Sequence, residues 1–229
     1  MTPSVFEAPL PGARAFFSTR LGGVSEGAYS SLNLGILTDD DGRHVEENRR
    51  RLLERVGAEE VAFGQQVHGA ELAEWSGPSG RPLLEVDAHA TERRGLALLV
   101  LVADCLPVAL AGPGRVAMLH CGWRGLAGGI VERALATFGE PPAAALGPCI
   151  GQCCYEVGPE VLDAFSGLSG VADGRMLDLR AVAEAKLRAA GVTTVRHVDV
   201  CTSCNPDLLF SHRRDSGVTG RQCGIVVRT

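Results

Sequence analysis

One cysteine and two histidines, Cys105, His120 and His68, stand at the ends of predicted strands, each within two residues of a glycine or a carboxylate. One thiolate and two neutral imidazoles suit zinc, and three protein ligands leave a fourth position open for water or substrate. The same thiol and imidazole could instead act as nucleophile and base. A lone histidine is more often an ordinary core or surface residue. Whether these three residues form a functional site therefore depends on whether they lie close together in the fold.

The positions of Cys105 and His120 follow from a predicted β-hairpin. Apolar segments flank a Gly-Pro-Gly-Arg turn signal, so Gly112 pairs with Arg115 across the turn. Counting back along both strands puts Cys105 opposite Gly122, with His120 on the same face at a diagonal distance of about 7–8 Å. A three-residue loop would shift the pairing by one residue and send the two side chains to opposite faces.

Two residues close to Cys105 and His120 could take part in proton transfer or anion binding. Asp104 is suited to orienting a ligand histidine or to transferring a proton, and it is equally suited to a turn. Arg124 directly precedes a helix predicted over 125–138, so its guanidinium and the free N–H of Gly125 form a candidate anion site. A tight strand-to-helix turn would explain the same glycines.

The chain contains eight cysteines and no recognisable secretory leader, which favours thiols, metal ligands or a nucleophile over a disulfide framework. Cys201 and Cys204 form a CxxC pair, and a second group upstream consists of Cys149, Cys153 and Cys154. Their spacing matches no standard zinc finger, and it leaves open whether the two groups meet in a second metal site or remain buried free thiols.

Composition limits the classes of partner. The 229 residues are 45% hydrophobic, enough for one substantial core, and we expect a single domain over residues 1–229 that acts as a monomer. A net charge of -5 without a large basic face argues against nucleic-acid binding. No apolar run approaches the roughly 18 residues of a membrane helix, so we expect a cytoplasmic protein that binds small molecules.

Strand and helix patterns alternate along the chain. Asp41 and Gly57 bracket a predicted helix over 42–56, and the continuous apolar run over 96–102 predicts a strand buried on both faces. Because clear hairpins occur among interleaved helices, the patterns favour an α+β fold with mixed sheets. Further strands are expected over 13–19, 61–67, 143–146, 195–200 and 225–228, and further helices from Pro159 and from Asp178 to Gly191.

Eight short motifs resemble those of the laccase-domain family, also called the polyphenol oxidase or peptidoglycan editing factor family. The resemblance runs from about residue 16 to the C-terminus, and its QVHG, ADC and HxGWRG motifs together are highly specific. The motifs are Ser18-Thr-Arg-Leu-Gly-Gly-Val-Ser25, Ser31-Leu-Asn-Leu-Gly35, Glu47-Asn-Arg-Arg50, Gln66-Val-His-Gly69, Ala103-Asp-Cys-Leu-Pro107, His120-Cys-Gly-Trp-Arg-Gly125, Gly147-Pro-Cys-Ile-Gly151 and Cys153-Cys-Tyr-Glu-Val157.

Members of this family are regarded as zinc-dependent purine nucleoside phosphorylases with adenosine deaminase activity. The resemblance implies two packed mixed sheets flanked by helices in α/β/β/α layers, and a catalytic zinc held by His68, Cys105 and His120. The assignment of His68 depends chiefly on this resemblance. Asp104 and Arg124 are then the catalytic candidates, and the candidates for binding substrate or phosphate are Arg20, Asn33, Gln66 and Gly125.

The chain departs from the usual family pattern at three positions. Cys121 replaces a common alanine, His89 an aliphatic residue and His212 a common tyrosine. None of these is one of the three expected metal ligands. Cys121 and His212 lie near the motifs, so we expect any effect to be on substrate preference.

Two other functions use the same residues. Cys105 as nucleophile with His120 as base would make the protein a cysteine-dependent amidohydrolase that edits a peptidoglycan precursor. Copper-dependent phenol oxidation, suggested by the older family name, needs many histidines in HxH pairs. The chain has six histidines and no HxH pair, so we do not expect copper.

Overall fold

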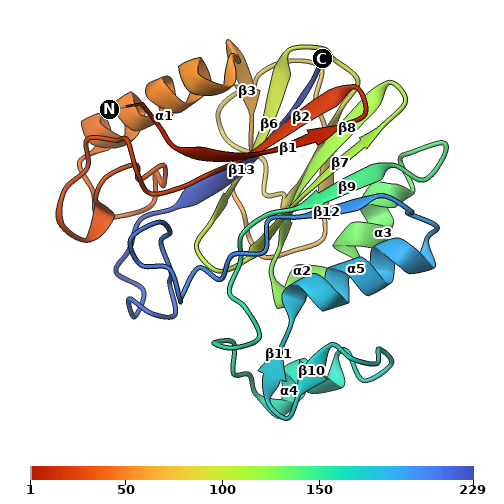
Figure 1. The fold of residues 1–229 in the computed structure, drawn as a ribbon. Coiled ribbons are helices and arrows are strands. Elements are labelled where there is room, and N and C mark those ends of the chain that lie inside the picture. The colour runs from red at the N-terminus through yellow and green to blue at the C-terminus, as the bar shows by residue number, and fades with distance from the viewer. Residues whose placement is uncertain (1) are drawn as a thin grey trace.

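Two mixed β-sheets pack against each other and are covered by helices on their outer faces (Figure 1). The computed structural model describes residues 2–229. The first sheet has the strand order β1-β2-β13-β6-β3, in which only β3 and β6 pair in parallel. Its strands are β1 (Val5–Leu10), β2 (Ala13–Ser18), β13 (Gln222–Arg228), β6 (Leu96–Val102) and β3 (Glu60–Ala62).

The second sheet has the order β12-β9-β7-β8-β5-β4 and contains the predicted hairpin. Gly112 pairs with Arg115 and Pro107 with His120, so the register expected from the sequence is confirmed. A separate two-stranded ribbon is formed by β10 and β11. These strands are β12 (Val195–His197), β9 (Ala143–Leu146), β7 (Leu106–Gly112), β8 (Arg115–Cys121), β5 (Ala88–Thr91), β4 (Leu72–Glu74), β10 (Ala172–Asp173) and β11 (Met176–Leu177).

Helix α1 covers the outer face of the first sheet, while α2, α3 and α5 cover that of the second (Figure 1). The predicted ends of α1 are confirmed: the Asp41 carboxylate caps the first turn, and Gly57 ends the helix in the left-handed conformation with φ +73°. The helices are α1 (Gly42–Val56), α2 (Trp123–Ala127), α3 (Ile130–Leu135), α4 (Pro159–Asp163) and α5 (Leu179–Ala189), with a short 3-10 turn η1 (Gly27–Tyr29).

The hydrophobic core is divided by these layers. Between the sheets, Val100 of β6 packs in the same cluster as Ala109 of β7 and Met118 of β8. Outside the first sheet, Leu52 of α1 packs with Ile225 of β13. The α/β/β/α arrangement expected for the family is therefore confirmed, because each sheet buries one face against the other sheet and one against helices.

The predicted helix over 125–138 is wrong in one respect, because two short helices, α2 and α3, occupy this stretch. The break lies at Gly128 and Gly129, and Gly129 adopts φ +85°, which an α-helix does not contain. The strands expected over 61–67 and 195–200 are shorter, since only β3 and β12 form ladders there.

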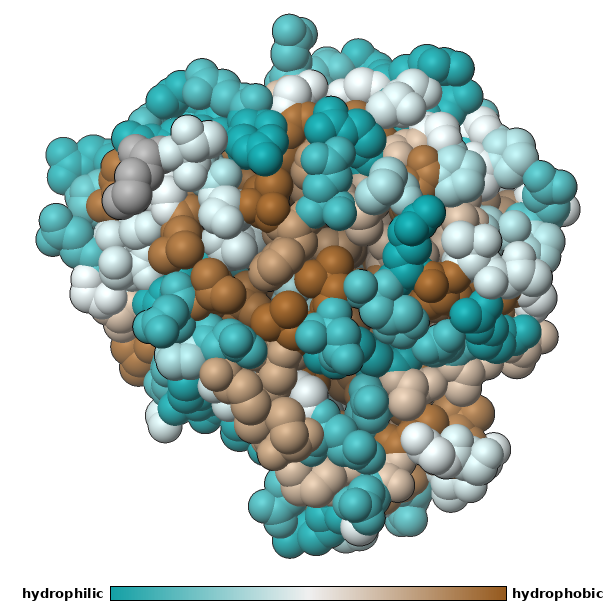
Figure 2. All heavy atoms as spheres, viewed as in Figure 1, coloured by the Kyte–Doolittle hydropathy of each residue, from teal (hydrophilic) through white to brown (hydrophobic). Residues whose placement is uncertain are grey.

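The face of the molecule seen in Figure 2 exposes both apolar and hydrophilic residues. In Figure 2, apolar residues are visible near the middle of the face, with hydrophilic residues around them. Within residues 2–229, no helix has the length and apolar character needed to cross a membrane.

Candidate metal centre and cavity

The structure brings His68, Cys105 and His120 together at one edge of the two sheets. One ligand atom from each lies within 4.8 Å of the others, and the two imidazole rings meet edge to face with centroids 4.9 Å apart. Cys105 lies where the chain crosses from β6 of the first sheet to β7 of the second, and His120 lies near the end of β8. His68 comes from the loop between β3 and β4, so residues distant in sequence form the group.

Two of these segments have unusual backbone conformations. His68 has φ +60° and Asp104, directly before Cys105, has φ +90°, a region that residues other than glycine rarely adopt. Such conformations persist only where the surroundings hold them, and they are concentrated at functional sites. The loop ends thus present the His68 and Cys105 side chains in one arrangement.

Gly122 allows the close approach of these groups. A Cβ atom at this position would lie 3.3 Å from the Cys105 Sγ and 3.3 Å from the His68 Cδ2. The Gly122 position, which hairpin counting placed opposite Cys105, therefore has little room for a side chain. The corner between β8 and α2 is thus part of the wall around the three ligand atoms.

Asp87, which was not among the site residues predicted from the sequence, bonds to both His120 and the loop that bears His68. Its Oδ1 accepts hydrogen bonds from the His120 Nδ1 at 2.7 Å and from the His68 backbone N–H at 3.0 Å. Its Oδ2 accepts from the N–H groups of Val67 and Gly69, at 3.0 and 2.9 Å. A carboxylate in this position fixes the imidazole tautomer and leaves Nε2 of His120 for a ligand.

The environment of Asp87 keeps its carboxylate ionised. Burial raises its pKa, but the hydrogen bond and charge of His120 and the N–H groups of Gly69 and Val67 outweigh burial, so the pKa is lowered. An aspartate among small and apolar residues, in Glu85-Val-Asp-Ala-His-Ala90, is the sequence signal that could have revealed it, and the structure shows it fully buried.

Gln66 joins the loop that bears His68 to the first sheet. Its Nε2 donates to the Leu101 carbonyl at 2.7 Å, and its Oε1 accepts from the Leu101 N–H at 2.7 Å. The side chain lines the cavity, but both of its polar ends are bonded to β6. The geometry therefore gives Gln66 a positioning role, and the substrate contact expected from the sequence stays a prediction.

Cys105 and His120 change each other's ionisation when no metal is bound. Burial raises the pKa of Cys105, but the charge of His120 and hydrogen bonds from His120 and His68 outweigh it and lower the pKa to about 6. Burial lowers the pKa of His120, but the Cys105 thiolate and Asp87 outweigh it and raise the pKa to about 9. The pair is thus a thiolate and an imidazolium at neutral pH.

The three side chains fit a metal ion by their chemistry and position. A thiolate and two imidazoles are a borderline-soft donor set, and an ion would replace the imidazolium proton. Three protein donors leave room for a further ligand, and the ligands open into a cavity. No further histidine, cysteine, aspartate or glutamate joins this group within residues 2–229.

The cavity in front of the three ligands has a volume of about 710 Å³, within the range of small-molecule sites. Its walls combine aromatic and aliphatic side chains with four guanidinium groups. The Arg124 guanidinium lies over the Trp123 ring at 4.5 Å. The aromatic and aliphatic lining residues include Phe63, Leu101, Trp123, Ile150 and Tyr155, and the arginines are Arg81, Arg124, Arg213 and Arg221.

Asp104 also lines the cavity, and its carboxylate is held by the C-terminal part of the chain. Its Oδ1 accepts from the Thr202 hydroxyl at 2.6 Å, and its Oδ2 from the Arg213 N–H at 2.7 Å. Each carboxylate oxygen has a second lone pair, so proton transfer remains compatible with these bonds. Asp104 thus couples the Cys105 corner to the segment that contains Arg213.

Two expected substrate-binding residues lie outside the cavity lining. Arg20 donates to the carbonyls of Ser30 and Pro206, at 2.7 and 2.8 Å, and its guanidinium lies over the Phe210 ring. Asn33 is fully buried, and its Oδ1 accepts from the N–H groups of neighbouring loops. Both side chains use their polar atoms to hold loops together, and their assignment to substrate stays a prediction from the sequence.

Gly125 also lies outside the cavity lining. It is buried within α2, where a Cβ atom would lie 2.8 Å from the Gly69 carbonyl oxygen. The glycine therefore permits α2 to pack against the loop that bears His68. The phosphate contact expected through its N–H stays a prediction, and the arginines in the wall are cations that line the cavity.

The three departures from the family pattern lie in different surroundings. His212 lines the cavity, whereas Cys121 is buried in the cluster under α2. His89 is also buried, where its Nδ1 accepts from the Trp75 indole N–H at 3.2 Å, and burial lowers its pKa to about 4. Of the three, only His212 can touch a molecule in the cavity.

The fold and the site together define a protein with two packed mixed sheets and a group of three side chains that could hold a metal ion, facing a small-molecule cavity. The chain belongs to the family described as multi-copper polyphenol oxidoreductase laccase, which matches residues 14–229. The resemblance noted in the sequence is therefore confirmed.

Relatives of similar length extend this result. The chain is 41% identical to a purine nucleoside phosphorylase of Pseudomonas aeruginosa over 95% of each chain. It is 36% identical to the Escherichia coli purine nucleoside phosphorylase YfiH, over 94% of this chain and 93% of that one.

Two solved structures share the fold. A Neisseria meningitidis protein of the DUF152 family superposes with a TM-score of 0.87 at 34% identity, over 100% of this chain and 99% of that one. YlmD from Geobacillus stearothermophilus also gives 0.87 at 34% identity, over 96% and 94% of the two chains.

Proposed function

We propose that the protein is a zinc-dependent purine nucleoside enzyme that cleaves adenosine and inosine with phosphate and deaminates adenosine. The observation that carries the proposal is the convergence of His68, Cys105 and His120, within 4.8 Å, on the cavity. The relatives named purine nucleoside phosphorylase support the substrate class. Because the ligands come from segments that join both sheets, we infer that the whole chain acts as one catalytic domain.

Zinc is our choice of metal although the family description mentions copper. A multicopper centre needs many histidines, whereas only two occur in this group. Two histidines and one cysteine can also form a blue-copper site, but that site adds a weak axial methionine or glutamine. Neither Met118 nor Met176 lines the cavity, and the Gln66 amide is bonded to Leu101.

The cavity lining suits the parts of a purine nucleoside and phosphate. Aromatic and aliphatic side chains, Trp123 and Tyr155 among them, offer faces for a purine base. Arg124 and Arg221 offer guanidinium groups that can bind phosphate through paired hydrogen bonds. Asp104, which lines the cavity, would transfer a proton at one of its Oδ atoms. Zinc bound by the three ligands would supply Lewis-acid activation for deamination.

The test is a product analysis of the zinc-loaded protein. We expect adenosine and inosine to yield free base and ribose 1-phosphate only when phosphate is present, and adenosine to yield inosine and ammonia without it. The matched control is Cys105→Ala prepared with zinc, which should lose both activities. An absence of turnover with both nucleosides in zinc-loaded wild type would refute the proposal.

A second candidate function follows from one specific observation. Cys105, His120 and Asp87 form a thiolate, imidazolium and carboxylate series like that of a cysteine hydrolase. The reactivity of the Cys105 thiol distinguishes the two functions. A metal-bound thiolate should resist alkylation until a chelator is added, while a free nucleophile should react at once and cleave amide substrates.

A further inference from the structure

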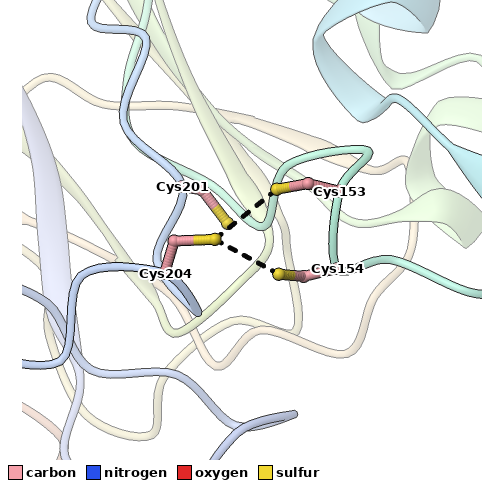
Figure 3. Close-up of side chains that lie close together, drawn as sticks. All are labelled: Cys153, Cys154, Cys201 and Cys204. Atoms are coloured by element: carbon pink, nitrogen blue, oxygen red, sulfur yellow. Dashed lines mark hydrogen bonds between the residues drawn. The ribbon is translucent and has the colours of Figure 1, made fainter.

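A second cluster of potential ligands lies away from the three residues described above. The Sγ atoms of Cys153, Cys154, Cys201 and Cys204 all lie within 4.8 Å of one another. Figure 3 shows their side chains pointing toward one another from two separate loops, 153–154 and 201–204. Two groups whose sequence spacing matched no standard motif are therefore joined by the fold.

The distances between the sulfur atoms match those around a single tetrahedral ion. The Sγ of Cys204 lies 3.6 Å from that of Cys153 and 3.4 Å from that of Cys154. Zinc–sulfur bonds of about 2.3 Å place the sulfurs at the corners of a tetrahedron about 3.8 Å apart. A disulfide would need about 2.05 Å, and an iron–sulfur cluster at the centre would need more space than these atoms leave.

Backbone and side-chain contacts of the two loops hold the cluster in place. The Gly151 N–H donates to the Cys201 Sγ at 3.2 Å, a contact of the kind that stabilises a metal-bound thiolate. Gly151 has no Cβ, which would lie 3.2 Å from the Cys153 Sγ and 3.2 Å from the Cys201 Cβ. The Asn205 side chain donates to the Cys201 carbonyl at 2.8 Å and fixes the second loop.

We propose that Cys153, Cys154, Cys201 and Cys204 bind one zinc ion in a tetrahedral site of four thiolates. Soft thiolate ligands suit zinc, and four protein ligands leave no position open for substrate. The site is therefore structural, in contrast to the three-ligand centre in the cavity. It is independent of the proposed nucleoside chemistry.

The zinc site would support one wall of the cavity. The hydroxyl of Thr202, between two of the ligands, donates to the Asp104 carboxylate at 2.6 Å. Tyr155 follows Cys154 directly and lines the cavity, and its ring lies 5.2 Å from the Arg213 guanidinium carbon. One ion would thus tie the loop that precedes Tyr155 to the loop whose Thr202 hydroxyl holds Asp104.

Metal analysis of purified protein tests the proposal directly. Prepared with zinc, the wild type should contain about two zinc ions per chain, and both Cys105→Ala and the double variant Cys153→Ser/Cys204→Ser should contain about one. Cys149→Ala, which removes a buried cysteine of the same loop outside the cluster, should keep two. Unchanged zinc content in the double variant would overturn the proposal, as would iron or copper in its place.

A measurement on the unmutated chain covers the case in which the double variant fails to fold. Cobalt(II) loaded into wild type and into Cys105→Ala should give the intense thiolate charge-transfer bands and the tetrahedral d–d spectrum of four sulfur ligands in both proteins. Loss of this spectrum in Cys105→Ala would overturn the proposal. Disulfides among the four cysteines, detected by alkylation and mass spectrometry before and after reduction, would overturn it too.

Discussion

At the scale of single residues, Asp87 holds both His120 and the loop that bears His68, although it was not among the site residues predicted from the sequence. One carboxylate accepts hydrogen bonds from a ligand imidazole and from three consecutive backbone N–H groups of the loop that bears His68. It therefore sets the position of two ligands without touching the cavity, since the cavity lining does not include it. Partners of this kind orient metal ligands and raise their basicity.

Asp87→Asn should weaken zinc binding by about 10–100-fold, because the amide cannot accept from His120 and from all three N–H groups at once. Competition with a chromophoric chelator measures the affinity. Glu85→Gln, an exposed carboxylate two residues away, is the matched control and should bind zinc as wild type does. Equal affinities for the two variants would show that Asp87 has no orienting role.

The ionisation of Cys105 gives a second prediction, for the metal-free protein. Because the pKa of Cys105 is lowered to about 6, its thiolate should persist as pH falls from 8 and be lost through a midpoint near 6. His120→Gln removes the main stabilising charge and leaves burial, which raises the pKa, so the midpoint should move above 6.

Alkylation rates followed against pH, with the Cys105 peptide quantified by mass spectrometry, measure that midpoint. Cys223 is a control within the same chain, because burial raises the pKa of its thiol to about 11 and it should stay unreactive across this range. A Cys105 midpoint that does not move in His120→Gln would contradict the assigned pairing.

At the scale of secondary-structure elements, the site depends on a close approach between the β7–β8 hairpin and the loop between β3 and β4. Gly122 supplies the space, and Gln66 supplies the attachment to β6. Neither residue needs to touch a substrate for its substitution to alter the site.

Gly122→Ala should weaken zinc binding, because its Cβ would lie 3.3 Å from both Cys105 and His68 and would force one of them to move. Zinc affinity by competition titration is the measurement. Gly139→Ala is the matched control, since a Cβ there meets no atom within 4 Å. If both variants bind zinc equally well, the loop absorbs the extra methyl group and close approach is not required.

Gln66→Leu should lower the free energy of unfolding by about 1–3 kcal/mol, because it leaves the N–H and carbonyl of Leu101 without their partner. Urea denaturation gives the value. Gln65→Leu, at the exposed neighbouring position, should change it by less than about 0.5 kcal/mol. Similar losses in the two variants would argue against the anchoring role.

At the scale of the whole molecule, the three-ligand centre joins the two sheets. Cys105 lies in the crossover from β6 to β7, and His68 lies in the connection from β3 to β4, so both connections pass from the first sheet to the second. An ion held there would bind only the folded chain and would stabilise it by mass action.

Free zinc at about 100 times its dissociation constant should therefore raise the unfolding free energy by about 2.7 kcal/mol. Cys105→Ala should lack this increment, while any contribution of the four-cysteine site is equal in both proteins. Denaturation curves with and without zinc measure the two increments. Equal increments in wild type and Cys105→Ala would exclude a stabilising ion at this centre.

Local sequence patterns predicted the structural features that depend on residues close together in the chain. The hairpin register follows from its turn and from strand alternation, and both ends of α1 follow from Asp41 and Gly57. These features are set by short local segments, a tight turn for the hairpin and the two end residues of one helix, so the sequence alone determines them. Cys105 and His120 could be placed on one face for the same reason.

Only the tertiary structure decided which distant segments meet. It brought His68 and Asp87 to the hairpin, joined the two cysteine groups, and placed Arg20 and Asn33 among loop contacts outside the cavity. The α/β/β/α order was expected from resemblance and not from spacing. Contacts of this kind depend on how two sheets pack and where the chain crosses between them, and no short-range periodicity encodes those positions.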